Sequence, residues 1–195
     1  NFMDGINGIT GGYSLVVLLS LAYINEEVTP FVEQDLIYTV IMSVLVFCFF
    51  NFRKKARCFA GDVGSVSIAF ILLFLLGKLI IQTGDFSWII LLSVYGVDSV
   101  LTIFHRLMLH ENIGLPHRKH LYQLMANELR IPHVVVSVIY MVLQFLIVAG
   151  LLWLPVDHWV YFFTVIGGLA VIYIICMYRY YPLHETYLKQ QNIIK

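Results

Sequence analysis

Charge is scarce in this sequence. Lys, Arg, Asp and Glu together make up 12% of its 195 residues, about half the share of a soluble domain, in which about 25% are charged. The twelve basic and twelve acidic residues balance to a formal net charge of zero, so no bulk positive charge attracts nucleic acid and we expect no such partner. The cysteines lack the spacing of a metal site or a disulfide framework and are interpreted as packing residues: Cys48, Cys58 and Cys176.

Apolar residues are abundant instead. They make up 60% of the chain, and the mean hydropathy is +0.84. Six apolar segments follow one another at 10–24, 36–52, 65–82, 87–107, 132–154 and 158–178. A membrane-spanning helix needs about 20 residues, with a range of about 17–25, so four segments are long enough, the second is marginal and the first is short unless it begins nearer Ile6. We find no internal repeat. The sequence therefore predicts an all-α polytopic membrane protein, a single transmembrane domain of residues 1–195 with about six spanning helices.

The distribution of charge predicts the orientation. If the N-terminus is cytoplasmic, 11 of the 12 Lys and Arg fall on the cytoplasmic side, and the exception, Lys78, can extend its side chain outward from the third segment. The opposite loops hold acidic residues and neither Lys nor Arg: Glu26, Glu27, Glu33, Asp35, Asp85 and Asp157. This positive-inside pattern predicts an inner (cytoplasmic) membrane protein with both termini in the cytoplasm. It places residues 1–9, 53–64, 106–131 and 179–195 on one face.

The beginning of the chain also carries information. Asn1 already lies inside a motif-like stretch, and no signal-peptide pattern precedes the first apolar segment. We therefore expect the chain to be the C-terminal portion of a longer protein.

Residues 58–65, CFAGDVGS, set a carboxylate between two long apolar segments. A carboxylate at the mouth of a membrane helix is costly unless it binds something. Asp62 also lies where a helix N-terminus would direct free N–H groups outward, a natural place for phosphate, and Gly61 and Gly64 allow close approach of a ligand. A metal ion on Asp62 and a phosphate on that metal would satisfy the arrangement. The alternative, that Asp62 or Ser65 simply caps a helix, is equally open from this stretch alone.

Two further stretches on the same predicted face are rich in polar groups. Asn1, Asp4 and Asn7 recur every third residue in a glycine-rich stretch, and they would share one side of a helix if the segment is helical. The alternative is a flexible lead-in to the first span. In the third loop, Arg118 offers a planar fork for phosphate and His120 can donate to phosphate or move a proton. The alternative there is a basic loop against anionic lipid headgroups.

Asp98 lies inside the fourth apolar segment. An intramembrane carboxylate is a candidate site residue by default. The alternative is a hydrogen bond between helices that involves Ser99 or Thr102.

Taken in order, residues 1–8 (NFMDGING), 59–65 (FAGDVGS), Asp98 and residues 118–121 (RKHL) resemble the polyprenyl-phosphate N-acetylhexosamine-1-phosphate transferases of glycosyltransferase family 4. This is the superfamily of the phospho-MurNAc-pentapeptide translocase and the undecaprenyl-phosphate GlcNAc-1-phosphate transferase. The resemblance implies a Mg²⁺-dependent reaction, with Mn²⁺ as an alternative ion, in which a polyprenyl phosphate attacks the β-phosphorus of a UDP-N-acetylhexosamine and releases UMP. Such a reaction initiates cell-envelope polysaccharides such as O-antigen or capsule, and a homodimer is compatible with it.

The resemblance also implies residue roles. Asp62 would ligate the metal, with Asn1 as a second ligand. Asp62, Asp4 and His120 are the expected catalytic residues. The expected substrate-binding residues include the wall of a uracil pocket and the groups that hold the diphosphate: Asn7, Gly5, Ile6, Phe59, Gly61, Arg118, Lys119 and Asp98.

Two departures limit what the resemblance implies. Many members carry two further histidines where this chain has Tyr122 and Gln123, which points to a different sugar or different contacts with it. The paired aspartates of an earlier loop are missing, so we predict that this chain alone is catalytically inactive. The alternatives to an enzyme are a transporter and an inactive membrane scaffold.

Overall fold

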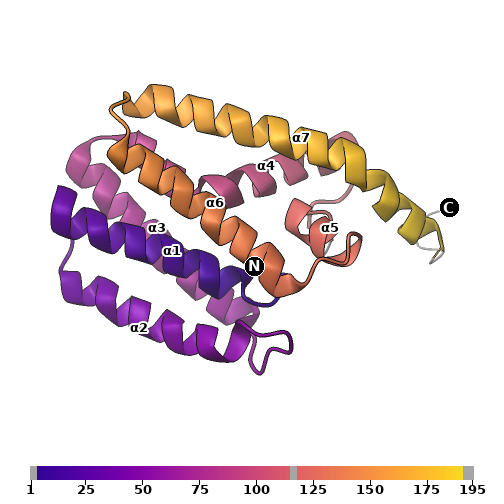
Figure 1. Cartoon of the computed structure of the whole chain (residues 1–195), viewed down its shortest axis with the longest axis horizontal. Coiled ribbons are helices and arrows are strands. Elements are labelled where there is room, and N and C mark those ends of the chain that lie inside the picture. Colours follow the sequence, from indigo (N-terminus) through magenta and orange to yellow (C-terminus); the bar gives the residue numbers. More distant parts are fainter. Residues whose placement is uncertain (1–3, 115–117, 191–195) are drawn as a thin grey trace.

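The structure, a computed structural model, describes residues 4–114 and 118–190, with no side chains after residue 184. All regular elements in these ranges are helices (Figure 1). They are α1 (Ile9–Tyr23), the π-helical turn η1 (Ile24–Val28), α2 (Gln34–Asn51), α3 (Gly61–Thr83), the 3₁₀ segment η2 (Phe86–Leu92), α4 (Ser93–Met108), α5 (Leu121–Asn127), α6 (His133–Trp153) and α7 (His158–Gln190). The all-α prediction is confirmed.

Six helical stretches are long and apolar enough to cross a membrane, which matches the predicted number. The first runs over Ile9–Val28, because η1 continues α1 without a break, so it reaches 20 residues and is not short. The fourth, Phe86–Met108, joins η2 to α4. The short helix α5 lies between the fourth and fifth spans and was not predicted as a separate element.

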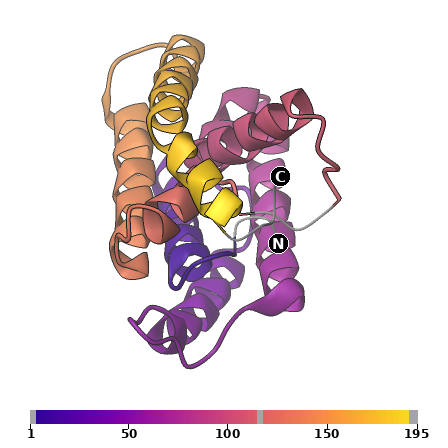
Figure 2. The ribbon, with the colours of Figure 1, turned by 90° about the vertical axis from the view of Figure 1, so that its right-hand side faces the viewer.

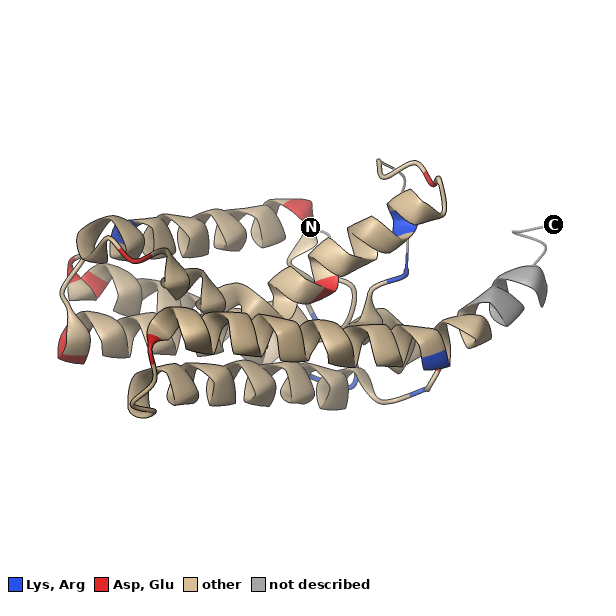
Figure 3. Ribbon diagram, turned by 90° about the horizontal axis from the view of Figure 1, so that it is seen from above, with Lys and Arg blue, Asp and Glu red and all other residues tan. Residues whose placement is uncertain are grey.

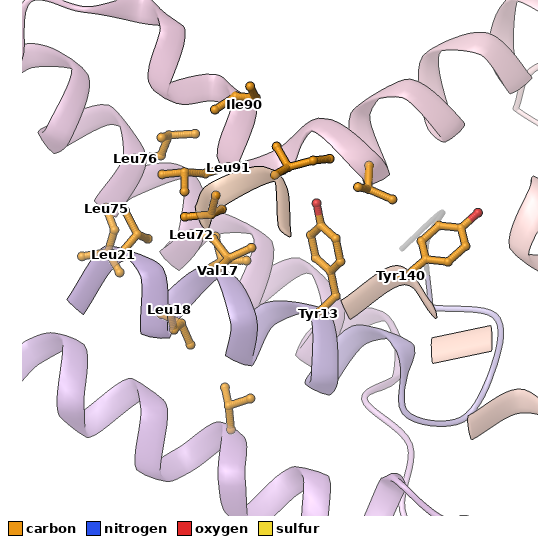
Figure 4. Close-up of a cluster of buried hydrophobic side chains, with 14 of the residues drawn as sticks. Tyr13, Val17, Leu18, Leu21, Leu72, Leu75, Leu76, Ile90, Leu91 and Tyr140 are labelled. Atoms are coloured by element: carbon orange, nitrogen blue, oxygen red, sulfur yellow. The ribbon is translucent and has the colours of Figure 1, made fainter. Parts of the chain in front are cut away.

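The first span is the centre of the bundle. Of its apolar window 72% is buried, against 11% for the last span, and α1 lies between α2 and α6 (Figure 1). Figure 4 shows its buried face, with side chains from α3 and η2 packed against it: Tyr13, Val17, Leu18, Leu21, Leu72, Leu75, Leu76, Ile90 and Leu91. Because lipid tails are as apolar as these side chains, close packing and hydrogen bonds have to hold such helices together.

Gln144 of α6 supplies hydrogen bonds where the fourth span is not α-helical. Its Oε1 accepts from the Tyr13 hydroxyl (2.6 Å) and from the Val94 amide (3.2 Å), and its Nε2 donates to the Ile90 carbonyl (3.0 Å). The Ile90 carbonyl also accepts from the Ser93 amide, so Gln144 adds a second donor there and gives the Val94 amide a side-chain acceptor. A buried amide side chain replaces the partners that water cannot provide in a bilayer.

Most Lys and Arg lie at one end of the bundle (Figure 3). We call the end formed by residues 4–8, 52–60, 109–114 and 118–132 the basic end; it faces the viewer in Figure 2. The loops on which the candidate site residues were predicted therefore do meet at one end. Which side of the membrane this end faces stays a prediction.

Residues 4–8 do not continue α1 as a helix, so the one-sided arrangement considered for Asp4 and Asn7 is wrong. Gly8 has a left-handed backbone (φ 86°), and a Cβ there would lie 2.5 Å from the Phe52 ring. Such a conformation interrupts a right-handed helix and favours glycine. Asn1 lies outside the described residues.

We expect the substitution Gln144→Leu to lower the free energy of unfolding by about 1–3 kcal/mol, because it removes the acceptor of the buried Tyr13 hydroxyl and of the Val94 amide. Equilibrium unfolding in detergent measures this. Ser43→Ala is the control, since the exposed Ser43 hydroxyl bonds only its own helix and should change stability by less than about 0.5 kcal/mol. Equal stability of the two variants would contradict the role given to Gln144.

Candidate functional site

The loop before α1 is fixed by its own side chains. The Thr10 hydroxyl donates to Asp4 Oδ1 (2.6 Å). Asn7 donates from Nδ2 to the Arg53 carbonyl (3.1 Å), and its own carbonyl accepts from the Ser137 hydroxyl (2.9 Å). Ile6 is only 6% exposed and belongs to the core. Ile6 and Asn7 therefore anchor the loop, while Asp4 stays half-buried beside it.

Asn51, at the last position of α2, joins two of the predicted site loops. Its Oδ1 accepts from the Gly8 amide (2.7 Å), and its Nδ2 donates to the Cys58 carbonyl (2.8 Å). The side chain is buried, so both bonds are shielded from water. Asn51 thereby fixes the 52–60 loop, which leads into α3, against the loop before α1.

Asp62 is the second residue of α3 and is exposed. The structure gives its carboxylate no hydrogen bond or ion pair within residues 4–114 and 118–184, and α3 has no side-chain capping bond. The Ser65 hydroxyl donates instead to the Asp62 carbonyl (3.2 Å). The simple capping alternative is therefore not what the structure shows, and this carboxylate is available at the basic end. Phe59 and Gly61, next to it in the chain, are exposed as well.

Asp98 and His120 lie together. The Asp98 side chain is 3% exposed, and its Oδ1 lies 3.4 Å from His120 Nδ1. Oδ1 accepts from the Leu121 amide (3.0 Å), and Oδ2 accepts from the Tyr140 hydroxyl (2.7 Å). The Thr102 hydroxyl also donates to Oδ1 (3.2 Å), but both residues belong to α4, so this is not the bond between helices considered from the sequence. The bond of Thr102 to another span is with the Tyr173 hydroxyl of α7 (2.8 Å). His120 itself is buried.

The two basic residues before His120 have different surroundings. Arg118 is exposed. Lys119 is buried, bonds the Glu111 carboxylate, and donates to the Tyr181 hydroxyl (3.1 Å). Arg106 Nε lies 3.2 Å from the other Glu111 oxygen. Lys119 therefore holds the loop to α7, and Arg118 is the cation of the pair that can reach a ligand.

The loop before α1 contacts the beginning of α5. A Cβ at Gly5 would lie 2.6 Å from both the Tyr122 hydroxyl and Gln123 Nε2, so only glycine fits without a shift. Burial raises the pKa of Tyr122 above its ordinary value, and the charges of Asp98 and Asp4 raise it further. Tyr122 and Gln123 are both buried. Their side chains pack against Gly5.

Two cavities flank the start of α3. One of about 490 Å³ lies between α1, α3 and α4 and includes Asp4, Ser65 and Tyr95 in its lining. The other, of about 420 Å³, lies between α1, α2 and α3 and includes Phe59 and Gly64. Both linings are mainly apolar, and neither includes Asp62, Arg118 or His120.

The predicted metal site can be tested only in part. Within residues 4–114 and 118–184 no three His, Cys, Asp or Glu side chains come together as a metal site. Asn1 lies outside the described residues. Mg²⁺ commonly takes one or two carboxylates and keeps waters and substrate phosphates as its other ligands, so a single exposed carboxylate such as Asp62 fits one place in its coordination sphere.

Residues 1–81 match Glycosyl transferase family 4. The chain is also 32% identical over 132 residues to a probable undecaprenyl-phosphate N-acetylglucosaminyl 1-phosphate transferase of Bacillus subtilis (strain 168). The N-terminal part of the chain is thus similar to glycosyl transferase family 4. The match covers 65% of the chain and 36% of that relative, so the chain spans about a third of the relative's length. No solved structure matches the chain.

The family 4 match includes Asp4 and Asp62 but ends before Asp98, Arg118 and His120. The structure adds these later residues to the same end of the molecule, because Tyr122 and Gln123 pack against Gly5. It does not bring every predicted residue together, since the Asp62 carboxylate makes no hydrogen bond with Asp4, Asp98 or His120.

The sequence reasoning missed a row of polar residues on α6. They contact Asn7, Asp98, and the junction of η2 with α4, and they recur at intervals of four, three and four: His133, Ser137, Tyr140 and Gln144. This spacing places them on one helix face. Polar residues repeating at helical spacing inside an apolar span are the signal that could have identified them.

We expect Gly5→Ala to lower the free energy of unfolding by about 1–3 kcal/mol, because the added methyl group overpacks against Tyr122. The matched control is Gly77→Ala in α3, where a Cβ meets nothing within 4 Å. There the better helix propensity of alanine should leave stability unchanged or raise it by about 1 kcal/mol. Thermal unfolding in detergent compares the two, and equal melting temperatures would contradict the tight contact at Gly5.

The Glu111 cluster should make the basic end sensitive to acid. Burial alone would raise the pKa of Glu111, but hydrogen bonds from Lys119 and Arg106 outweigh it and lower that pKa below the ordinary value. A lowered pKa stabilises the fold above the unfolded-state value of about 4.3, and this stabilisation is lost as the pH falls through the folded-state pKa. We expect Glu111→Gln to be less stable than the wild type at pH 7 and to lose less further stability below about pH 4.

Unfolding measured between pH 7 and pH 3 tests this expectation. Glu27→Gln, an exposed acidic position at the opposite end of the bundle, should follow the wild type throughout. A Glu111→Gln profile parallel to that of the wild type would show that the cluster does not contribute to acid sensitivity.

Proposed function

We propose that the chain is part of a membrane enzyme that transfers N-acetylhexosamine-1-phosphate from a UDP-sugar to polyprenyl phosphate and releases UMP. This step would initiate a cell-envelope polysaccharide, such as O-antigen or capsule, on the cytoplasmic face of the inner membrane. The observation that carries the proposal is the exposed Asp62 carboxylate at the start of α3. It has no hydrogen-bond or ion-pair partner among the side chains that the structure describes, and it lies within the residues that match family 4.

The charges around Asp62 suit a diphosphate substrate. The 52–60 loop that leads into α3 contains Arg53, Lys54, Lys55 and Arg57, and the last three are exposed. Phosphoryl transfer needs mainly positioning and charge neutralisation, with little covalent chemistry from the protein. Asp62 would hold Mg²⁺, which when bound neutralises the charge on the diphosphate. Arg118 would bind the phosphate oxygens through its planar fork.

The acceptor substrate, polyprenyl phosphate, has to approach from the membrane. The cavity between α1, α3 and α4 is mainly apolar, has Asp4 in its lining, and reaches Ser65 in the first turns of α3. Such a lining suits a prenyl chain, because burial of apolar surface provides the affinity. Its phosphate would then lie near Asp62, while Asp4 would lie beside it.

We further propose that the 195-residue chain is inactive alone, since it spans about a third of its relative. Membranes that express the chain, and membranes that express it with the upstream reading frame, would be given polyprenyl phosphate and a panel of UDP-N-acetylhexosamines. UMP release would be followed with and without Mg²⁺. Mg²⁺-dependent release with one sugar, from the extended protein only, is the expected result. If the folded, extended protein releases no UMP with any of the sugars, the membrane-scaffold alternative is favoured.

In the active protein we expect Asp62→Asn to lower UMP release at least about 100-fold, because an amide is a poor ligand for Mg²⁺ and carries no charge. The matched control is Asp35→Asn, since Asp35 is also an exposed second residue of a spanning helix but lies at the opposite end. That control should keep near-normal turnover, and both variants should unfold at the wild-type temperature. Near-normal turnover of Asp62→Asn would remove Asp62 from the mechanism.

A further inference from the structure

The Asp98 carboxylate has no capacity left for a substrate. Its Oδ1 accepts from the Thr102 hydroxyl and the Leu121 amide and faces His120 Nδ1, as described above, and its Oδ2 accepts from the Tyr140 hydroxyl and more distantly from the Tyr122 amide (3.5 Å). An ionised carboxylate offers about four lone-pair sites, and four hydrogen-bond donors occupy them here.

These contacts fix the beginning of α5. This helix has only seven residues, and a helix so short is not stable by itself in water. Its first N–H groups have no partner within the helix, and Asp98 accepts from the first two, those of Leu121 and Tyr122. A negative charge at a helix N-terminus also stabilises the helix. The carboxylate of α4 thus holds α5 in place from a different span.

The same carboxylate orients His120. His120 is the N-cap residue of α5, and its Nδ1 faces Asp98 while its ring stacks on that of Tyr122. The 3.4 Å between Nδ1 and Oδ1 is within ion-pair range but is not a hydrogen bond, so Asp98 fixes His120 mainly through the backbone at the start of α5, to which it is hydrogen-bonded. Arg118 lies two residues before His120, so its backbone position follows from the same anchor.

We propose that Asp98 is a positioning residue, which fixes His120 and Arg118 for the diphosphate and does not touch substrate. This replaces the substrate-binding role expected from the sequence. The inference rests on the proposed function where it assigns Arg118 to the diphosphate, and on the catalytic role that the family resemblance implies for His120.

The first test is kinetic and uses the extended, active protein. Asp98→Asn should lower kcat about 10–100-fold, the usual effect of losing such a supporting contact, and should change the KM of the UDP-sugar less than about threefold. In a His120→Gln background the same change should lower kcat less than about threefold, because Asp98 acts through His120. Fully additive losses, or a large rise in KM, would overturn the proposal.

Thr102→Val is the matched control. It removes another hydroxyl donor from Asp98 but leaves every contact with α5 and α6 in place, so kcat should stay within about threefold of the wild type. If Asp98→Asn does not fold, Tyr140→Phe takes its place in the comparison with and without His120→Gln. Loss of the Tyr140 hydroxyl should lower kcat about threefold or more in the wild-type background. In the His120→Gln background it should lower kcat less than about twofold.

A second test needs no activity. Hydrogen exchange of the Leu121 and Tyr122 amides in detergent should be at least about tenfold faster in Asp98→Asn, because their acceptor is weakened. It should be unchanged in Thr102→Val. Unchanged exchange in Asp98→Asn would overturn the inference, whatever the enzyme does. If the wild type releases no UMP but exchange responds, the proposed function fails while the positioning of α5 stands.

Discussion

The structure depends on satisfying the polar backbone groups that leave regular helix inside or beside a membrane. Polar side chains on one face of α6 form hydrogen bonds at three positions along the helix. Ser137 binds the loop before α1, Tyr140 binds Asp98, and Gln144 binds the junction of η2 with α4. Because these residues share one face of a single rigid helix, the loop before α1, the start of α5 and the fourth span are held at fixed distances from one another. The geometry of the basic end is thus set from within the membrane.

The sequence predicted the spans well because the bilayer imposes a simple length rule and a simple charge rule. The rule on length failed to place one boundary. Asn25 and Glu26 made the first segment look short, yet η1 carries the helix through them, and Asn25 is buried and binds the chain that follows (Phe31 amide, 2.8 Å). The position of α5 was not predictable, because seven residues give no usable periodicity and the anchor at Asp98 lies 23 positions away from Leu121.

The candidate site was predicted as a set of residues but not as a set of orientations. Motif membership suggested that Ile6 and Lys119 face a ligand. In the structure Ile6 packs in the hydrophobic core and Lys119 binds the Glu111 carboxylate. In a loop there is no period of 3.6 or 2 residues to say which side chain points inward. Only the tertiary partners decide. Asp62 differs because it begins a helix, where the first turn normally remains accessible at the end of the bundle.

The cations at the basic end fall into two groups with different consequences. Arg106 and Lys119 are buried and share the Glu111 carboxylate, so their charges are compensated and their contribution is to shape the loop. Arg118, Lys54, Lys55 and Arg57 stay exposed, so the positive potential of this end comes mainly from them. Such a surface attracts an anion, and an exposed carboxylate within it, Asp62, lowers the attraction unless it has a cation of its own. A site for a metal and a diphosphate together satisfies both charges, which a lipid-binding basic loop alone does not.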